Sequence, residues 1–164
     1  MNITFKGNPV TLSKEPIKKG DKLPDFKIVK NDLSEIYAKD TKGVRVFLSV
    51  PSLDTGVCSM EVENFMHYLE AYNDVDCYTI SMDLPFALDR WCQSKQNSRI
   101  VTASDYKDHE FANSTGLLVE ELGLLARSCF VVNADNEIVY MEVVKEISDE
   151  PNYDAVLNAI SQIA

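Results

Sequence analysis

The sequence predicts an α/β fold in which a central mixed sheet is flanked by helices. Mostly apolar strand candidates alternate with segments whose apolar residues recur every three or four positions, which is the spacing of one helix face. The last two strand candidates flank a short polar turn and predict a hairpin, so antiparallel pairing is also expected. At 164 residues the chain can bury a sizeable core, and a single domain over residues 1–164 is expected.

Several strand candidates precede the first helix. Residues 3–5 and 10–12 flank a turn at residues 6–9 and predict an N-terminal β-hairpin. Residues 26–29 predict the next strand. Residues 44–50 are mostly apolar, which is typical of a strand buried on both faces of a sheet.

A helix is expected after this buried strand, because apolar residues from Val62 to Leu69 follow the spacing of one helix face. Cys58 lies one turn before Val62 on that face, so its thiol is expected to point toward the body of the protein. Residues 77–82 predict a second central strand.

The rest of the chain continues the alternation of strands and helices. A helix opens with Pro85 in its first turn and contains Trp91 and Cys92. The remaining elements are a strand at residues 100–102, a short helix at 109–115 that ends at Gly116, two strands at 130–132 and 138–141 around a polar turn at 133–136, and a helix at 153–163.

Composition excludes several classes of function. The net charge of −10 argues against a nucleic-acid partner and against an anionic membrane surface. No apolar run approaches the roughly 18 residues that a membrane span needs. The first eight residues lack the apolar core of a signal peptide, so a cytoplasmic location is expected.

The four cysteines, at positions 58, 77, 92 and 129, form no C-x-x-C pair. His67 and His109 do not lie near a cysteine pair, so no structural zinc site is expected. A reducing compartment also disfavours a static disulfide framework. Catalytic or redox use of some thiols therefore remains, together with simple burial of others.

The strongest motif is Pro-Ser-Leu-Asp-Thr-Gly-Val-Cys at residues 51–58, where a strand gives way to a helix. Unpaired backbone N–H groups and the positive end of the helix dipole favour a thiolate at Cys58. The pattern P-x-x-x-T-x-x-C resembles the peroxidatic motif of peroxiredoxins, and the full wording resembles the thiol peroxidase branch of that superfamily. The resemblance covers nearly the whole chain and implies a thioredoxin-like fold.

Reduction of a hydroperoxide needs a thiolate nucleophile and donors for the oxygen that gains charge. Thr55 offers a hydroxyl that can bond to both the sulfur and the peroxide, and Pro51 fixes the loop and helps to exclude water. A cation is also needed. The segment Gly-Leu-x-Ala-Arg ending at Arg127 resembles the one that supplies the active-site Arg of thiol peroxidases, and Arg suits the role because it stays charged.

The resemblance also implies that Cys92 resolves the Cys58 sulfenic acid as an intramolecular disulfide. The segment Asp-Leu-Pro-Phe-Ala from Asp83, followed by Trp91 and Cys92, is similar to one in the family, where Phe often stands in place of Trp91. A disulfide needs Cα atoms about 4.4–6.8 Å apart. Since the two cysteines lie on different predicted helices, both segments are expected to unwind locally after oxidation.

What the resemblance implies beyond the site is a thioredoxin reductant, a homodimer joined near the active-site loops, and a preference for organic hydroperoxides. No metal, flavin or haem is implied. Leu53, Phe86 and Leu125 are apolar candidates for the lining of an alkyl-tail site.

Several alternatives stay open at this point. Cys77 and Cys129 are expected to be packing residues, although Cys129 shares a strand face with Arg127 and could react with the sulfenic acid. Glu61 is either a first-turn acid matched to the helix dipole or a contact of the active-site Arg. A protein thiol–disulfide oxidoreductase would share the fold, but it normally carries C-x-x-C. A peroxide sensor would use the same residues as the peroxidase.

Overall fold

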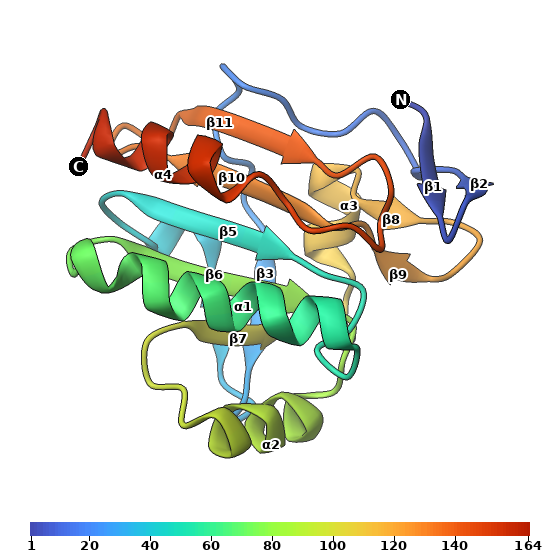
Figure 1. The fold of residues 1–164 in the computed structure, drawn as a ribbon, viewed down its shortest axis with the longest axis horizontal. Helices are drawn as coiled ribbons and strands as arrows, with labels where there is room; N and C mark the ends of the chain where they lie inside the picture. Colours follow the sequence, from blue (N-terminus) through green and yellow to red (C-terminus); the bar gives the residue numbers. More distant parts are fainter.

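The computed structural model describes all 164 residues and centres on a seven-stranded mixed sheet (Figure 1). In spatial order its strands are β11 (Ile138–Val143), β10 (Ser128–Val132), β5 (Arg45–Ser49), β6 (Asp76–Ser81), β7 (Val101–Ser104), β3 (Lys27–Lys30) and β4 (Glu35–Tyr37). The strands β5, β6 and β7 are parallel, and all other neighbours are antiparallel. The predicted mixed α/β architecture is therefore confirmed.

Helices cover both faces of this sheet (Figure 1). The helices α1 (Gly56–Tyr68), α2 (Pro85–Lys95) and α4 (Tyr153–Ser161) contribute to one core cluster, and α3 (Glu110–Thr115) contributes to the other. Short 3-10 turns span Ala38–Asp40 and Leu69–Ala71. None of the helices is both long enough and apolar enough to span a bilayer.

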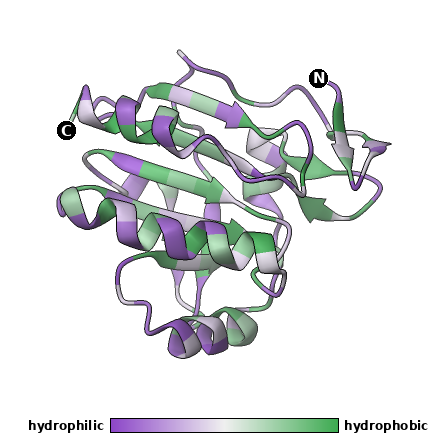
Figure 2. Ribbon diagram, in the orientation of Figure 1, coloured by the Kyte–Doolittle hydropathy of each residue, from purple (hydrophilic) through white to green (hydrophobic).

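Strand β5 divides the two cores by the alternation of its side chains. All five of its residues are buried, as the apolar run predicts. Val46 and Leu48 pack on the α1 side, while Phe47 packs on the α3 side and stacks against Tyr78 and Phe130. Figure 2 shows the hydrophobic colouring concentrated on the central strands, whereas the helices alternate between hydrophobic and hydrophilic segments. The end of β5 thus leads directly from the core into the loop before α1.

The N-terminal hairpin is tighter than the sequence predicts. Strands β1 (Ile3–Phe5) and β2 (Asn8–Val10) are joined by Lys6 and Gly7, which have φ values of 51° and 82°. The predicted turn over residues 6–9 is therefore wrong in extent, because two residues with positive φ match the twist of a hairpin. Pro9 is accommodated inside β2 because this strand lies at an edge.

A second small hairpin, which the sequence does not predict, is formed by β8 (Leu118–Val119) and β9 (Leu124–Leu125). It leads into the segment that contains Arg127. The strand β4 is likewise not predicted.

Gly116 ends α3, as the sequence predicts. It adopts a left-handed conformation with φ of 76°, and its N–H donates to the carbonyl of Ala112. A Cβ atom at this position would lie 2.8 Å from the carbonyl oxygen of Glu15. Glycine is therefore needed both for the backbone conformation and for the close approach of a second chain segment.

We expect Gly116→Ala to destabilise the protein more than Gly123→Ala, which is its matched control. Both glycines have positive φ, and a Cβ at Gly123 would meet no atom within 4 Å. Left-handed strain alone costs about 1–2 kcal/mol, and the clash at Gly116 adds about 1–3 kcal/mol. Urea unfolding of the two variants measures the difference. Equal losses of unfolding free energy would contradict the proposed close approach.

Candidate active site

Cys58 lies in the first turn of α1, immediately after the loop that leaves β5. Thr55 is the N-cap residue of this helix, and its hydroxyl accepts a hydrogen bond from the Cys58 N–H at 3.4 Å. The Cys58 side chain is fully buried, which confirms that it points toward the body of the protein. The start of the helix therefore fixes the position of the sulfur within the core.

Arg127, the residue immediately before β10, faces Cys58. Its side chain is 2% exposed, and its Nη2 donates to the Cys58 Sγ at 3.2 Å. Its Nη1 donates to the Glu61 Oε1 at 3.0 Å, and its Nε donates to the Ile147 carbonyl at 2.7 Å. A buried cation therefore lies in direct contact with the sulfur, where its donors can also reach an oxygen bound beside the sulfur. The planar fork of the guanidinium holds all three partners in one geometry.

Glu61 contacts the arginine, which decides between the two roles that the sequence leaves open. Its side chain is fully buried, and its Oε2 has no hydrogen-bond partner. Burial raises the pKa of Glu61 to about 7, although the charge of Arg127 acts in the opposite direction. The Glu61 carboxyl group therefore titrates near neutral pH while it contacts Arg127, the residue that faces Cys58.

Thr55 and Pro51 lie in the loop between β5 and α1. The Thr55 hydroxyl donates to the Ser52 carbonyl at 3.1 Å, and this residue is exposed. No hydrogen bond joins this hydroxyl to the Cys58 sulfur, so in this structure Thr55 acts as a helix cap. Pro51 is buried beside the end of β5. The contact between Thr55 and a bound peroxide stays a prediction.

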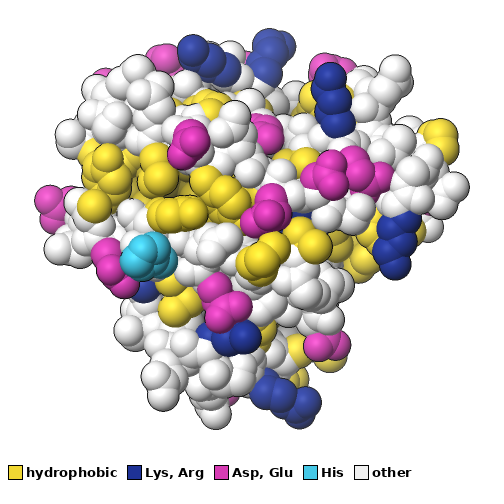
Figure 3. All heavy atoms as spheres, viewed as in Figure 1, with side chains coloured by type: hydrophobic (Ala, Val, Ile, Leu, Met, Phe, Trp, Pro, Cys, Tyr) yellow, Lys and Arg dark blue, Asp and Glu magenta, His cyan; other side chains and the backbone are white.

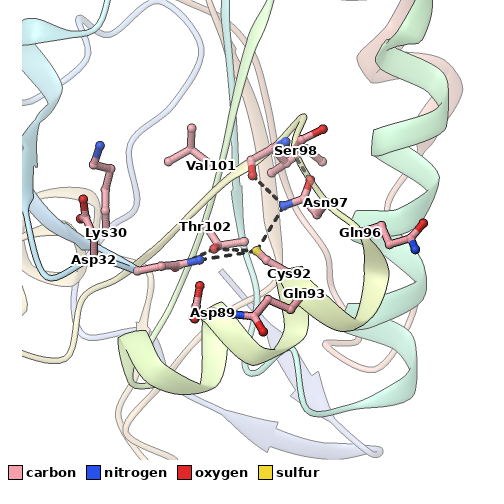
Figure 4. Close-up of a pocket in the computed structure, with 12 residues that line it drawn as sticks. Lys30, Asp32, Asp89, Cys92, Gln93, Gln96, Asn97, Ser98, Val101 and Thr102 are labelled. Carbon is pink, nitrogen blue, oxygen red and sulfur yellow. Dashed lines mark hydrogen bonds between the residues drawn. The ribbon is translucent and has the colours of Figure 1, made fainter.

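Cys92 lies on α2, and both it and Cys58 are free thiols. It is half-buried and lines a pocket of about 550 Å³, where polar side chains surround its sulfur (Figure 4). These side chains belong to Asn31, Asn97 and Thr102. The structure therefore places Cys92 in surroundings quite unlike those of Cys58.

Direct hydrogen bonds nevertheless connect the two segments that carry these cysteines. The Trp91 Nε1 donates to the Ser59 Oγ at 2.9 Å, which joins α2 to the first turn of α1. The Asp83 carboxylate accepts from the Ser52 hydroxyl at 2.6 Å and from the Leu53 N–H at 2.8 Å. Between these contacts lies a second pocket of about 320 Å³. The loop before Cys58 and the helix of Cys92 are thus tied together.

The expected lining of an alkyl-tail site is not assembled. Leu53 and Leu125 belong to different core clusters, and Phe86 is 68% exposed. These residues therefore do not form one pocket wall. The sequence shows that each is apolar, but it does not show on which side of the sheet each one packs.

The other two cysteines are packing residues, as expected. Cys77 and Cys129 are fully buried in the same core cluster as Cys58. Burial raises the pKa of both thiols well above the ordinary value. Each is therefore a poor nucleophile in the folded protein. No group of three or more His, Cys, Asp or Glu side chains is arranged to hold a metal ion.

A buried cysteine paired with arginine at a helix start, and a second cysteine on a neighbouring helix, define a thiol-based oxidoreductase. The chain belongs to the Redoxin family, whose model matches residues 18–157. It is 48% identical over 159 residues to a thiol peroxidase from Clostridium acetobutylicum, with 97% of each chain covered. It is 47% identical over 158 residues to a thiol peroxidase from Listeria innocua, with 96% of each covered.

Among solved structures, a peroxiredoxin-like protein from Aquifex aeolicus matches with a TM-score of 0.94 at 36% sequence identity. The match covers 99% of this chain and 97% of the other. These comparisons confirm the resemblance that the sequence motifs indicate, and they confirm the thioredoxin-like fold.

We expect Glu61→Gln to change how the stability of the protein depends on pH. The folded protein keeps the Glu61 proton to about pH 7, whereas the ordinary pKa is 4.5. Between pH 4.5 and pH 7, folding therefore takes up a proton at Glu61. The contribution of Glu61 to the free energy of unfolding falls as the pH rises through this range, and above it the contribution stays constant. The stability of wild type relative to Glu61→Gln should fall between pH 5 and pH 8 by on the order of 2 kcal/mol.

Urea unfolding at both pH values tests this expectation. Glu120→Gln is the control, because the Glu120 side chain is exposed and forms no ion pair with a group that titrates in this range. Its difference from wild type should be the same at pH 5 and pH 8. A pH-independent difference for Glu61→Gln as well would show that burial does not hold the proton on Glu61.

Proposed function

We propose that the protein is a thiol-dependent peroxidase that reduces hydrogen peroxide and organic hydroperoxides with Cys58 as the nucleophile. One observation carries this proposal, namely the buried Arg127 Nη2 that donates to the Cys58 Sγ at 3.2 Å. Thiol peroxidases at 47% and 48% identity over nearly the full length support the same activity.

In the proposed reaction the Cys58 thiolate attacks one oxygen of the hydroperoxide. The O–O bond breaks, and the leaving oxygen takes a proton to form water or an alcohol, while Cys58 becomes a sulfenic acid. Negative charge moves from sulfur to oxygen during this step. Arg127 already faces the sulfur and can follow that charge with its donors, and Thr55 at the helix start offers a hydroxyl to the peroxide.

Pro51 has a steric role in this scheme. It is buried at the point where β5 ends, and its ring fixes the backbone at the start of the loop that leads to Cys58. Exclusion of water strengthens the interaction between the guanidinium and the reacting atoms.

Cys92 then resolves the sulfenic acid. Its sulfur bonds to the Cys58 sulfur, water leaves, and an intramolecular Cys58–Cys92 disulfide forms. Thioredoxin reduces this disulfide by thiol–disulfide exchange. This sequence of steps requires no metal, flavin or haem. Because both thiols start out free and on different helices, α1 and α2 have to open locally before the disulfide can form.

The proposed partners are thioredoxin and a second copy of the chain. Leu84 and Phe86, at the start of α2, are 53% and 68% exposed, which suits an interface near the active-site loops. Hydrophobic side chains also gather between α1 and α4 on the face that Figure 3 shows. Four free thiols suit a reducing compartment, so the proposed location is the cytoplasm.

Single cysteine variants test the roles of the two thiols. Cys58→Ser should abolish peroxide consumption, because no nucleophile remains in contact with Arg127. Cys92→Ser should reduce one equivalent of peroxide per chain and then stop, because the sulfenic acid has no resolving partner. Peroxide consumption coupled to thioredoxin oxidation, with peptide mapping under non-reducing conditions, measures both outcomes. Undiminished cycling of Cys92→Ser would assign the resolving role to another thiol.

We expect Arg127→Lys to lower the second-order rate constant for Cys58 oxidation by about 100-fold or more. An ammonium group loses the fork that contacts the sulfur, Glu61 and the Ile147 carbonyl together. Rapid quenching with an alkylating agent and mass spectrometry measures this rate constant. Arg45→Lys is the control, because Arg45 is an equally buried arginine that bonds to other segments. Similar rate constants for the two variants would contradict the role of Arg127.

A further inference from the structure

The sulfur of Cys92 is enclosed by three polar side chains, which we call the Cys92 cage: Asn31, Asn97 and Thr102. The Asn97 Nδ2 donates to the Cys92 Sγ at 3.2 Å, and the Asn31 Nδ2 donates to it at 3.6 Å. The Thr102 Oγ1 lies 3.2 Å from the same sulfur. Figure 4 shows these contacts converging on Cys92 at the wall of the pocket. The three residues come from the turn after β3, the segment just after α2 and strand β7.

The hydrogen bonds of the cage fix the orientation of Asn97. Its Oδ1 accepts from the backbone N–H groups of Arg99 and Ile100, at 3.1 Å and 3.0 Å. Its Nδ2 must therefore face the Ile100 carbonyl, at 2.8 Å, and the Cys92 sulfur. The Asn97 N–H also donates to the Cys92 carbonyl at 2.9 Å. Asn97 thus holds both the main chain and the sulfur of Cys92.

The same accounting places a proton on the Cys92 sulfur. The Thr102 hydroxyl has one hydrogen, and it donates to the Asn31 Oδ1 at 2.9 Å. At the sulfur the hydroxyl must therefore accept rather than donate. The hydrogen between Cys92 and Thr102 then belongs to the thiol, which accepts from two amides and donates to one hydroxyl. The cage satisfies a neutral thiol completely and keeps it in place.

We propose that Asn97 and Thr102 are positioning residues that hold Cys92 in its resting place and thereby set the rate at which it reacts with oxidised Cys58. This inference rests on the proposed function. The step it controls converts one sulfenic acid and one thiol into a disulfide and water. The S–S bond forms as the S–O bond of Cys58 breaks, and the departing hydroxide combines with the proton of Cys92. The Cys92 sulfur is oxidised, and the Cys58 sulfur is reduced by the same electron pair.

The cage has to open before this step, because Cys92 cannot approach Cys58 while its sulfur and carbonyl are held by the cage. A slow opening prolongs the life of the Cys58 sulfenic acid. A second peroxide then has time to convert it to the sulfinic acid, which ends the cycle. The strength of the cage therefore sets the balance between resolution and overoxidation.

Thr102→Val tests this proposal with little change of shape, and valine is well tolerated in a strand. Thr79→Val is the matched control. Thr79 is the parallel-strand neighbour of Thr102, it is equally buried, and its hydroxyl has no hydrogen-bond partner. Thr102→Ser keeps the hydroxyl and should restore wild-type behaviour.

Trp91 is the single tryptophan of the chain and the neighbour of Cys92, so its fluorescence reports the opening of α2. After rapid mixing with one equivalent of peroxide, we expect an oxidation phase followed by a resolution phase. Thr102→Val should accelerate the resolution phase by about fivefold, since of the two hydrogen bonds that this hydroxyl makes, the one to the Cys92 sulfur holds the thiol directly and has an ordinary net strength. The oxidation phase should not change, and less sulfinic acid should form in excess peroxide.

A second measurement needs no peroxide. In a Cys58→Ser background, the rate at which iodoacetamide alkylates Cys92 reports opening of the cage directly. Thr102→Val should raise this rate by about fivefold over Thr79→Val. Resolution and alkylation rates equal to those of Thr79→Val would overturn the cage while leaving the peroxidase intact. Wild-type protein that loses no thiol to peroxide would overturn the proposed function and the role of the cage in it.

Discussion

The buried guanidinium of Arg127 is the interaction on which the arrangement of the site depends. A charge removed from water costs several kcal/mol unless polar partners surround it. Here those partners are a sulfur from α1, a carboxyl group from the same helix and a carbonyl from the segment after β11. Each partner comes from a different turn or segment, so the fold must bring all of them to one point. Cys58 stays in contact with the guanidinium because its sulfur is one of only three hydrogen-bond partners that this buried cation has.

This requirement explains why the N-terminal hairpin, distant in sequence, is fastened to the site. Thr4 pairs with the backbone on both sides of Glu146: its N–H donates to the Lys145 carbonyl at 2.7 Å, and its carbonyl accepts from the Ile147 N–H at 2.8 Å. The Glu146 carboxylate accepts from the Thr4 hydroxyl at 2.9 Å and from the Gly7 N–H at 2.8 Å.

Hydrogen bonds from hydroxyl and backbone donors, those of Ser148 first among them, lower the pKa of Glu146 to about 2. The Glu146 carboxylate that holds the hairpin therefore stays ionised at neutral pH. The carbonyl that receives the Arg127 Nε belongs to the next residue, Ile147. The hairpin therefore supports the backbone that positions the arginine.

The sequence could predict the strand and the helix on either side of the Cys58 loop because the signals there are local. A buried strand, a helix start and a family motif converge within residues 44–58. Strands of two or three residues, such as β4, β8 and β9, establish no period and could not be found in this way. The sequence leaves two roles open for Glu61, because helix position alone does not show which side chain from another segment lies opposite.

The cage around Cys92 lay beyond the reach of the sequence for a related reason. Asn31 and Thr102 meet only because β3 pairs with β7, two strands far apart in the chain. The motif around Cys92 predicts its chemistry but not its neighbours. Polar residues such as Asn31 and Asn97 also occur in any surface turn, so their type carries no signal until tertiary pairing brings them to one sulfur.

The two thiols are held by different kinds of interaction, and this difference matches the order of reaction that we propose. Cys58 faces a full positive charge and is closed off from water, which suits the thiol that must attack first. Cys92 faces neutral amides and a hydroxyl at a half-exposed pocket wall, which suits a thiol that must wait.

The bonds from Trp91 to Ser59 and from Asp83 to Ser52 and Leu53 join the two segments. Neither segment can therefore move far without loosening its hold on the other. Because the helices are linked at their ends and packed into one core, a rigid shift of one helix would break more contacts than local unwinding of both.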